Sequence, residues 1–196
     1  MYSKRALGRY IAVDVDDVLA ERGHAVAKRL YELGLIDHEV LEPKIWNFRD
    51  CNVHPEVLYQ IQCKMFVDKR GYRGLSVVPG AREALRLFIN EGGSLCYVTG
   101  RSWVPREALK MVMEDTEMWL ADQGFPLAPV FFTEKKELVP TTWFVEDCPD
   151  MVKRIRRAGK RAIVFSRSYN RGLSGFRCER WTEFEASWRV GHVGLA

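Results

Sequence analysis

Short apolar runs alternate with amphipathic segments along most of this chain. Runs rich in β-branched and aromatic residues are typical of buried strands. The chain contains the runs Tyr10–Val15, Ser94–Thr99, Pro129–Thr133, Thr142–Val145 and Arg161–Phe165. The segments between the later runs carry apolar residues at helical spacing and are Ala81–Glu91, Pro105–Gln123 and Met151–Ala158. Because strands that alternate with helices form βαβ units, we expect an α/β fold, a Rossmann-like parallel sheet with helices on both faces.

The segment between the first strand and Pro79 interrupts this alternation. It contains no strand-like run, and the helices expected there are His24–Leu33 and Pro55–Val67. Its length of about 60 residues is far more than a βαβ crossover needs. We therefore predict a helical cap at 21–78, inserted after strand one, and an α/β core formed by 1–20 and 79–196. Such a cap would leave the sheet at the carboxyl ends of the strands, where open α/β sheets bind ligands.

The composition excludes several classes of protein. Of the 196 residues, 47% are hydrophobic and 29% are charged, which excludes disordered and collagen-like chains. No apolar run approaches the roughly 20 residues of a membrane span, and the N-terminal region lacks a signal-peptide core. The five cysteines form no CxxC pair, so reduced thiols are the simplest interpretation. We expect a cytoplasmic protein with no membrane partner.

Three carboxylates follow the first strand directly: Asp14, Asp16 and Asp17. Two charges about 4 Å apart repel by roughly 1 kcal/mol in water and roughly 4 kcal/mol at an effective dielectric constant of 20. A hard cation such as Mg²⁺ would offset this repulsion, since it prefers oxygen ligands. The alternative is a solvated acidic turn that caps the next helix.

Other polar groups end the later strands. These are Thr99 and Gly100, then Lys135 and Lys136, and then Glu146 and Asp147 with Asp150 beyond them. Each has an ordinary explanation alone: a common strand ending, solvated lysines and a helix N-cap region. The carboxyl ends of parallel strands, however, meet at one edge of a sheet. Two acidic clusters, a hydroxyl and an amine at that edge predict one site for a phosphate and a divalent cation.

These residues resemble the motifs of the haloacid dehalogenase (HAD) phosphohydrolase superfamily. DVDDVL at 14–19 resembles its first motif, Thr99 its second, Lys136 (or else Lys135) its third, and the acidic pair at 146–147 its fourth. A narrower likeness is to the 5′(3′)-deoxyribonucleotidases and their bacterial and phage relatives. It rests on the segments DVDDVLA, IWNF, VPGAREALRLF, VTGR, FVEDCPD, SYNR and ERWTEF. The chain departs from that family at Asp17, usually Gly or Glu, and at Glu146, more often Asp.

The resemblance implies a Mg²⁺-dependent phosphomonoesterase. Asp14 would attack phosphorus and form an aspartyl-phosphate, and Asp16 would protonate the leaving group and then deprotonate water. The implied ligands of Mg²⁺ are the Asp14 carboxylate, the Asp16 backbone carbonyl and the Asp147 carboxylate. Glu146 and Asp150 would lie behind these ligands, with Asp150 steering a metal-bound water. The implied phosphate-binding groups are Thr99, the Gly100 amide and Lys136.

The implied substrate is a small phosphate monoester, with a nucleoside monophosphate favoured. Trp46 and Phe48 in the cap are candidates for stacking on a base, although either could pack in the cap interior. Arg101 could rim the site or be structural. Two alternatives are a HAD phosphatase for a sugar phosphate or a nucleic-acid 3′-phosphate end, and a non-catalytic scaffold that binds phosphate ligands. A homodimer also remains open.

A basic cluster occupies residues 151–180, with ten Lys or Arg residues and one acid. It could bind nucleic acid. The interpretation that we favour is a solvated helix and strand face, because the cluster lacks regular aromatic residues among its charges.

Overall fold

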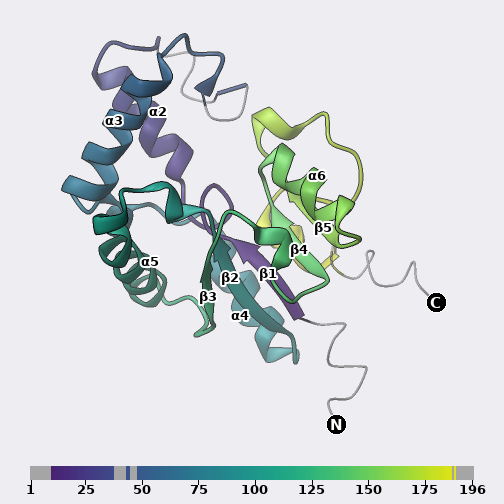
Figure 1. Cartoon of the computed structure of the whole chain (residues 1–196). Coiled ribbons are helices and arrows are strands. Elements are labelled where there is room, and N and C mark those ends of the chain that lie inside the picture. Colours follow the sequence, from purple (N-terminus) through teal and green to yellow (C-terminus); the bar gives the residue numbers. More distant parts are fainter. Residues whose placement is uncertain (1–9, 38–42, 45–47, 187, 189–196) are drawn as a thin grey trace.

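The computed structural model describes residues 10–37, 43–44, 48–186 and 188 (Figure 1). Six parallel strands form one sheet in the order β3-β2-β1-β4-β5-β6. Their bounds are β1 Tyr10–Asp14, β2 Ser94–Thr99, β3 Val130–Phe132, β4 Trp143–Glu146, β5 Arg161–Phe165 and β6 Arg177–Cys178. The predicted α/β fold is confirmed. The sequence analysis missed β6, since two residues are too few to show a period.

Five α-helices accompany these strands in the described residues. They are α2 Arg22–Glu32, α3 Pro55–Cys63, α4 Ala81–Asn90, α5 Leu109–Asp122 and α6 Pro149–Arg157. The side chains of β1 alternate between two cores, as the strand period requires. Ile11 and Val13 pack in the core that includes α4 and α5, whereas Ala12 packs in the core that includes α6. Helices therefore cover both faces of the sheet.

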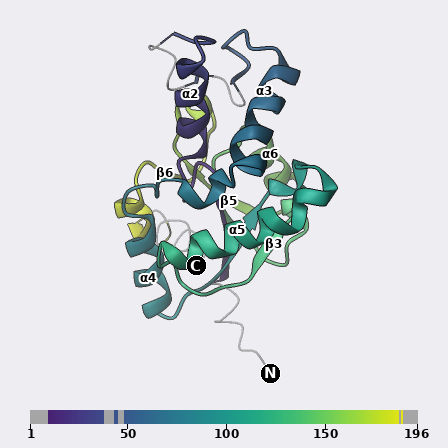
Figure 2. The ribbon, with the colours of Figure 1, turned by 90° about the vertical axis from the view of Figure 1, so that its left-hand side faces the viewer.

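The segment between β1 and α4 is helical. Besides α2 and α3 it contains a π-helical turn at Lys64–Asp68 and a 3₁₀ turn at Gly71–Gly74. The predicted helix Pro55–Val67 therefore changes its hydrogen-bond pattern after Cys63. Figures 1 and 2 show α2 and α3 side by side, beyond the carboxyl end of β1. We call residues 21–78 the inserted segment.

The chain enters and leaves the inserted segment at one place. Ala20 and Val77 form an isolated antiparallel bridge. The backbone N–H of Glu21 donates to the carbonyl of Ser76 at 2.9 Å, and the N–H of Val78 donates to the carbonyl of Leu19 at 2.8 Å. The two connections thus lie side by side at the end of β1. No described helix is both long and apolar enough to cross a membrane.

Candidate active site

Asp14 lies at the carboxyl end of the central strand, between β2 and β4. Its neighbours in the register are Val98 on β2 and, one residue earlier, Val145 opposite Val13. This is the point at which the strand order reverses, and such a point is where open α/β sheets bind ligands. The register also brings Thr99 and Glu146, the last residues of β2 and β4, to the same edge.

Lys136 links two of the buried acids. Its Nζ atom lies 2.7 Å from Asp14 Oδ1 and 2.8 Å from Glu146 Oε2. Asp14 Oδ1 also accepts from the backbone N–H of Val15 at 2.7 Å, and Glu146 Oε1 accepts from that of Cys148 at 3.0 Å. Burial alone would lower the pKa of Lys136, but the two carboxylates outweigh it and hold the ammonium charged.

The carboxylates of Asp14, Glu146 and Asp147 form a buried acidic cluster. One oxygen from each lies within 4.8 Å of the others. Burial raises the pKa of Asp14 well above its ordinary value, and Glu146 adds to this effect. Burial and Glu146 likewise raise the pKa of Asp147 to about 8. A divalent cation would relieve this concentration of charge, and three carboxylates are a donor set that suits one.

The loop after β5 supports Asp147. The Tyr169 hydroxyl donates to Asp147 Oδ2, and the Asn170 side-chain amide donates to the Asp147 carbonyl at 2.8 Å. The segment SYNR contributed to the family resemblance, but its sequence predicts no contact with Asp147. Only the folding of that loop back onto β4 brings them to Asp147.

Thr99 presents a buried hydroxyl at the same edge. Its Oγ1 atom has no hydrogen-bond partner among the described residues, and the side chain is fully buried. Buried polar groups without a partner are rare, so this hydroxyl is a candidate donor to a ligand oxygen, although Thr99 is not itself among the residues that line the cavity. The next residue, Gly100, lines the cavity, and a Cβ atom there would meet nothing within 4 Å.

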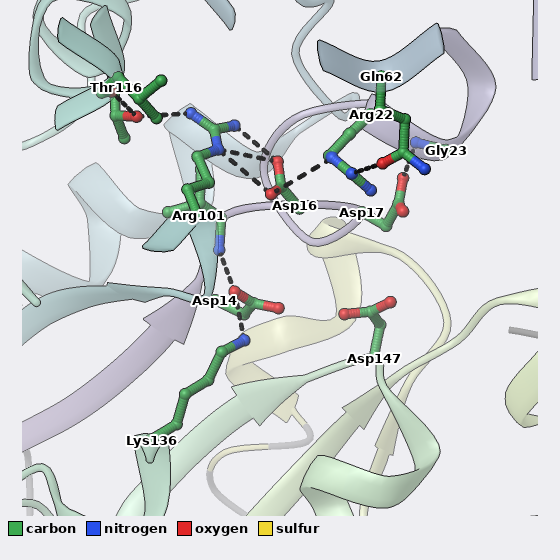
Figure 3. A network of polar contacts seen from close by, with 12 residues as sticks. Asp14, Asp16, Asp17, Arg22, Gly23, Gln62, Arg101, Thr116, Lys136 and Asp147 are labelled. Atoms are coloured by element: carbon green, nitrogen blue, oxygen red, sulfur yellow. Dashed lines mark hydrogen bonds and ion pairs between the residues drawn. The ribbon is translucent and has the colours of Figure 1, made fainter. Parts of the chain in front are cut away.

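Asp16 forms ion pairs with two arginines. Arg101 donates to both of its carboxylate oxygens, and Arg22 from α2 lies 3.8 Å away. In the view of Figure 3, Lys136 lies below Asp14, whereas Asp16 lies between Arg101 and Arg22. Burial would raise the pKa of Asp16, but the arginines outweigh it and the pKa lies below its ordinary value.

Asp17 connects the acidic turn to the inserted segment. It has a left-handed backbone with φ of 59°, and its Oδ1 atom accepts from the N–H of Gly23 at 2.7 Å. Its carbonyl accepts from Arg167 Nε at 2.7 Å. Burial raises the pKa of Asp17 to about 6. The alternative of a solvated acidic turn that caps the next helix therefore holds only in part for Asp17. Its carboxylate caps the first turn of α2, but it is partly buried rather than fully solvated.

A cavity of about 870 Å³ opens over these groups. The core contributes residues that include Asp14, Lys136 and Asp147, and the inserted segment contributes residues that include Phe48, Tyr59 and Gln62. Phe48 is buried and therefore meets the cavity through only a small part of its surface. Trp46, the other predicted stacking residue, lies outside the described residues.

The remaining predicted residues lie farther from the acidic cluster. Asp150 lines the cavity but is exposed, and it pairs with Lys153 at 3.6 Å. Lys135 is exposed, so Lys136 is the lysine that the fold brings to the acids. Arg22 and Gln62, which hydrogen-bond to each other at the cavity wall, were not predicted. No spacing signals them, because their position depends on how α2 and α3 pack.

Much of the basic cluster is used in contacts within the chain. Arg154 pairs with Glu137 at 2.7 Å, and Lys160 Nζ donates to the Val139 carbonyl at 2.5 Å. Arg177 donates to the backbone carbonyl of Leu173 at 2.7 Å. These contacts give part of the cluster a role within the fold, beyond the solvated face that the sequence favoured.

The comparisons with known proteins agree with this geometry. The model of the family described as 5′ nucleotidase, deoxy (pyrimidine), cytosolic type C protein matches residues 9–190. The chain belongs to this family. A protein of Chlorobaculum tepidum with the provisional name 5′(3′)-deoxyribonucleotidase is 27% identical over 177 residues, which cover 88% of this chain and 86% of that protein. The resemblance to the 5′(3′)-deoxyribonucleotidases is therefore confirmed, and we call the protein this nucleotidase-family chain.

Solved structures share the fold of this nucleotidase-family chain. A HAD-superfamily hydrolase from Geobacter sulfurreducens PCA has a TM-score of 0.54 at 16% identity, over 91% of this chain and 95% of that one. A HAD family hydrolase from Deinococcus radiodurans R1, with bound phosphate and sodium, has a TM-score of 0.52 at 14% identity, over 97% of this chain and 98% of that one. At these identities the likeness establishes the fold alone.

Proposed function

We propose that this chain is a Mg²⁺-dependent phosphomonoesterase that hydrolyses (deoxy)nucleoside monophosphates through an aspartyl-phosphate on Asp14. The observation that carries the proposal is the meeting of three groups at one sheet edge. These are a buried carboxylate held by Lys136, the unpartnered hydroxyl of Thr99, and the acidic cluster. They match the needs of phosphoryl transfer, which are a nucleophile, phosphate ligands and a metal site.

The donor set fits Mg²⁺. Asp14 and Asp147 would supply carboxylate oxygens and Asp16 its backbone carbonyl, and Mg²⁺ when bound would neutralise charge on the transferred phosphoryl group. Both oxygens of Glu146 already accept hydrogen bonds, from Lys136 and from the backbone of Cys148. We therefore assign Glu146 to holding Lys136, and we place the exposed Asp150 at the rim of the site.

Residues of this chain would then catalyse two successive nucleophilic displacements at phosphorus. An oxygen of Asp14 attacks phosphorus, and the bond from phosphorus to the ester oxygen breaks. The leaving oxygen takes a proton from Asp16, which must first be protonated when substrate binds, since the arginines lower its pKa in the ligand-free protein. A water molecule next attacks the phosphorus of the aspartyl-phosphate and gives a proton to Asp16. This second step releases inorganic phosphate and restores Asp14. Thr99, the Gly100 amide and Lys136 would hold the phosphoryl oxygens in both steps.

The size of the cavity suits a nucleotide. Its volume of about 870 Å³ is within the range of small-molecule sites, and its lining joins cations near the acidic cluster to aromatic residues of the inserted segment. Phe48 and Tyr59 of the inserted segment, together with Trp103 from the turn after β2, line this part and offer faces or edges for a base. We infer that the inserted segment is the cap that selects the leaving group, with boundaries at the paired connections near residues 20 and 78.

The proposed location is the cytoplasm. All five cysteines are among the described residues, and all are free thiols. A reducing compartment is the usual setting for such a chain.

A substrate panel tests the proposal. Purified protein would be assayed for phosphate release from nucleoside 5′- and 3′-monophosphates, sugar phosphates and a 3′-phosphorylated DNA oligonucleotide, with Mg²⁺ and with EDTA. We expect Mg²⁺-dependent release that is fastest for the nucleoside monophosphates. Faster release from a sugar phosphate or from the oligonucleotide would replace the substrate assignment. Absence of release from every compound would reject the phosphatase function.

A further inference from the structure

Arg101 is fully buried directly beside the site, and its guanidinium grips Asp16. Its Nη2 atom donates to Asp16 Oδ1 at 2.6 Å, and its Nε atom lies 3.1 Å from Oδ1 and 3.2 Å from Oδ2. Two neighbouring nitrogens on one carboxylate form the fork arrangement that fixes orientation as well as position. The Asp16 carboxylate therefore has little freedom to rotate.

The guanidinium is itself anchored from two other parts of the fold. Its Nη1 atom donates to Thr116 Oγ1 on α5 at 2.9 Å, and that hydroxyl donates in turn to the Val112 carbonyl at 2.7 Å. Its flat face lies over the ring of Tyr72 in the inserted segment, 4.0 Å from the ring centroid. Each guanidinium nitrogen is thus committed to a protein acceptor, and the side chain has no exposed surface to offer a substrate.

We propose that Arg101 is a positioning residue for Asp16, which fixes where that carboxyl group lies for proton transfer to the leaving oxygen. This inference rests on the proposed function and extends it. Arg101 acts through Asp16 and does not touch the substrate, in contrast to a residue at the rim. Thr116 and Tyr72 matter because they hold the guanidinium that holds Asp16.

If Arg101 positions Asp16, removing Arg101 should change how strongly the rate of hydrolysis depends on the leaving group. A leaving phenolate that is stable without a proton, such as p-nitrophenolate, needs no acid, whereas unsubstituted phenolate benefits from one. A misplaced Asp16 therefore slows poor leaving groups more than good ones. A substitution that merely loosens the fold, or that weakens phosphate binding, slows every member of such a series by the same factor.

The experiment measures kcat/KM for a series of substituted phenyl phosphates, from phenyl phosphate to p-nitrophenyl phosphate. This parameter covers the steps up to release of the phenol. For Arg101→Met we expect a loss of about 100-fold with phenyl phosphate and of about threefold or less with p-nitrophenyl phosphate. Arg101→Lys, which keeps the charge without the fork, should lie between wild type and Arg101→Met.

Two further variants guard against a loss of folding in the Arg101 variants. Thr116→Val removes the acceptor of Arg101 Nη1 but leaves Arg101 in place. Like Arg101→Met, it should lower kcat/KM more for phenyl phosphate than for p-nitrophenyl phosphate. Thr116→Ser keeps the hydroxyl and should restore the wild-type dependence. Arg73→Met is a matched control, since it removes an exposed arginine that pairs with Asp122 of α5 at 3.2 Å, and it should leave the series unchanged.

The outcomes separate the two levels of the proposal. Failure of the wild-type protein to hydrolyse any member of the series rejects the phosphatase function, and the role of Arg101 with it. A wild type that is active, with folded Arg101 and Thr116 variants that lose the same factor across the series, rejects the positioning role alone. Circular dichroism melts of each variant establish folding before the kinetics are compared.

Discussion

Lys136 lies between Asp14 and Glu146, with its ammonium nitrogen 2.8 Å from Glu146 Oε2, so that one buried cation serves two buried acids. The chain offers an adjacent control, because Lys135 is exposed. Lys136→Met would leave the acids without their cation. We expect a destabilisation of about 3–5 kcal/mol and a loss of phosphatase activity of about 100-fold or more. Urea melts and kcat/KM measure the two effects.

Lys135→Met should leave both quantities near their wild-type values, since that side chain is exposed and makes no buried ion pair with any described residue. If the two variants lost activity equally, the third motif would have been assigned to the wrong lysine.

Asp14→Asn should abolish turnover while the fold survives. The raised pKa of Asp14 means that its ionised form costs free energy in the metal-free folded state near pH 7, and a neutral amide removes that cost. We therefore expect a melting temperature no lower than that of the wild-type protein in EDTA. Phosphate release by Asp14→Asn at the wild-type rate would remove Asp14 as the nucleophile.

Binding of Mg²⁺ should release protons. The pKa of Asp147 is raised to about 8, so in the metal-free protein near pH 7 this carboxyl is largely protonated and must ionise to bind a cation. The affinity for Mg²⁺ should therefore increase as the pH rises from about 6 to about 8. Calorimetry in buffers of different ionisation enthalpy measures the released protons, and Asp147→Asn should reduce their number.

The raised pKa of Asp147 also determines whether the metal-free protein becomes more or less stable as the pH rises. Because the folded pKa of Asp147 lies above its unfolded value, the folded state binds more protons, and its stabilising contribution is lost as the pH rises through about 8. Thermal melts in EDTA should show lower stability at about pH 8 than at about pH 6, and excess Mg²⁺ should reduce the difference. An increase in stability over that range would contradict the shift.

Thr99→Val should trade activity for stability. The Thr99 hydroxyl is buried without a partner among the described residues, which costs about 1–3 kcal/mol, and valine has nearly the same shape. We expect a more stable protein with kcat/KM lowered by about tenfold or more. Thr99→Ser keeps the hydroxyl and should retain most of the activity. A less stable Thr99→Val protein would mean that the hydroxyl has a partner in solution.

The sequence predicted those parts of the site that depend on strand ends. Asp14, Thr99 and Glu146 each end a strand, and a parallel sheet brings such ends together whatever the loops do. The strands themselves were recognisable because their apolar runs are longer than the two residues of β6. The choice of Lys136 over Lys135 came from the resemblance, and the fold agrees with it.

Contacts made by the inserted segment and the loops could not be predicted in this way. Arg22 reaches Asp16 only because α2 folds back over the sheet edge. Asp17 appeared to be one of three equivalent acids, yet its left-handed backbone turns its carboxylate toward Gly23. Arg101 was assigned to the rim of the site or to the structure, and its buried position depends on the packing of Thr116 and Tyr72 against it. Such contacts follow from tertiary packing, which has no period in the sequence.

The hydrogen bonds that join Glu21 to Ser76 and Val78 to Leu19 have a consequence for how proteins of this kind can diversify. Because both connections between the inserted segment and the core lie at one place, the inserted segment can be lengthened, shortened or replaced without moving a strand of the sheet. The reacting residues at the strand ends would then stay the same among relatives, while the surface of the inserted segment that contacts the leaving group changes.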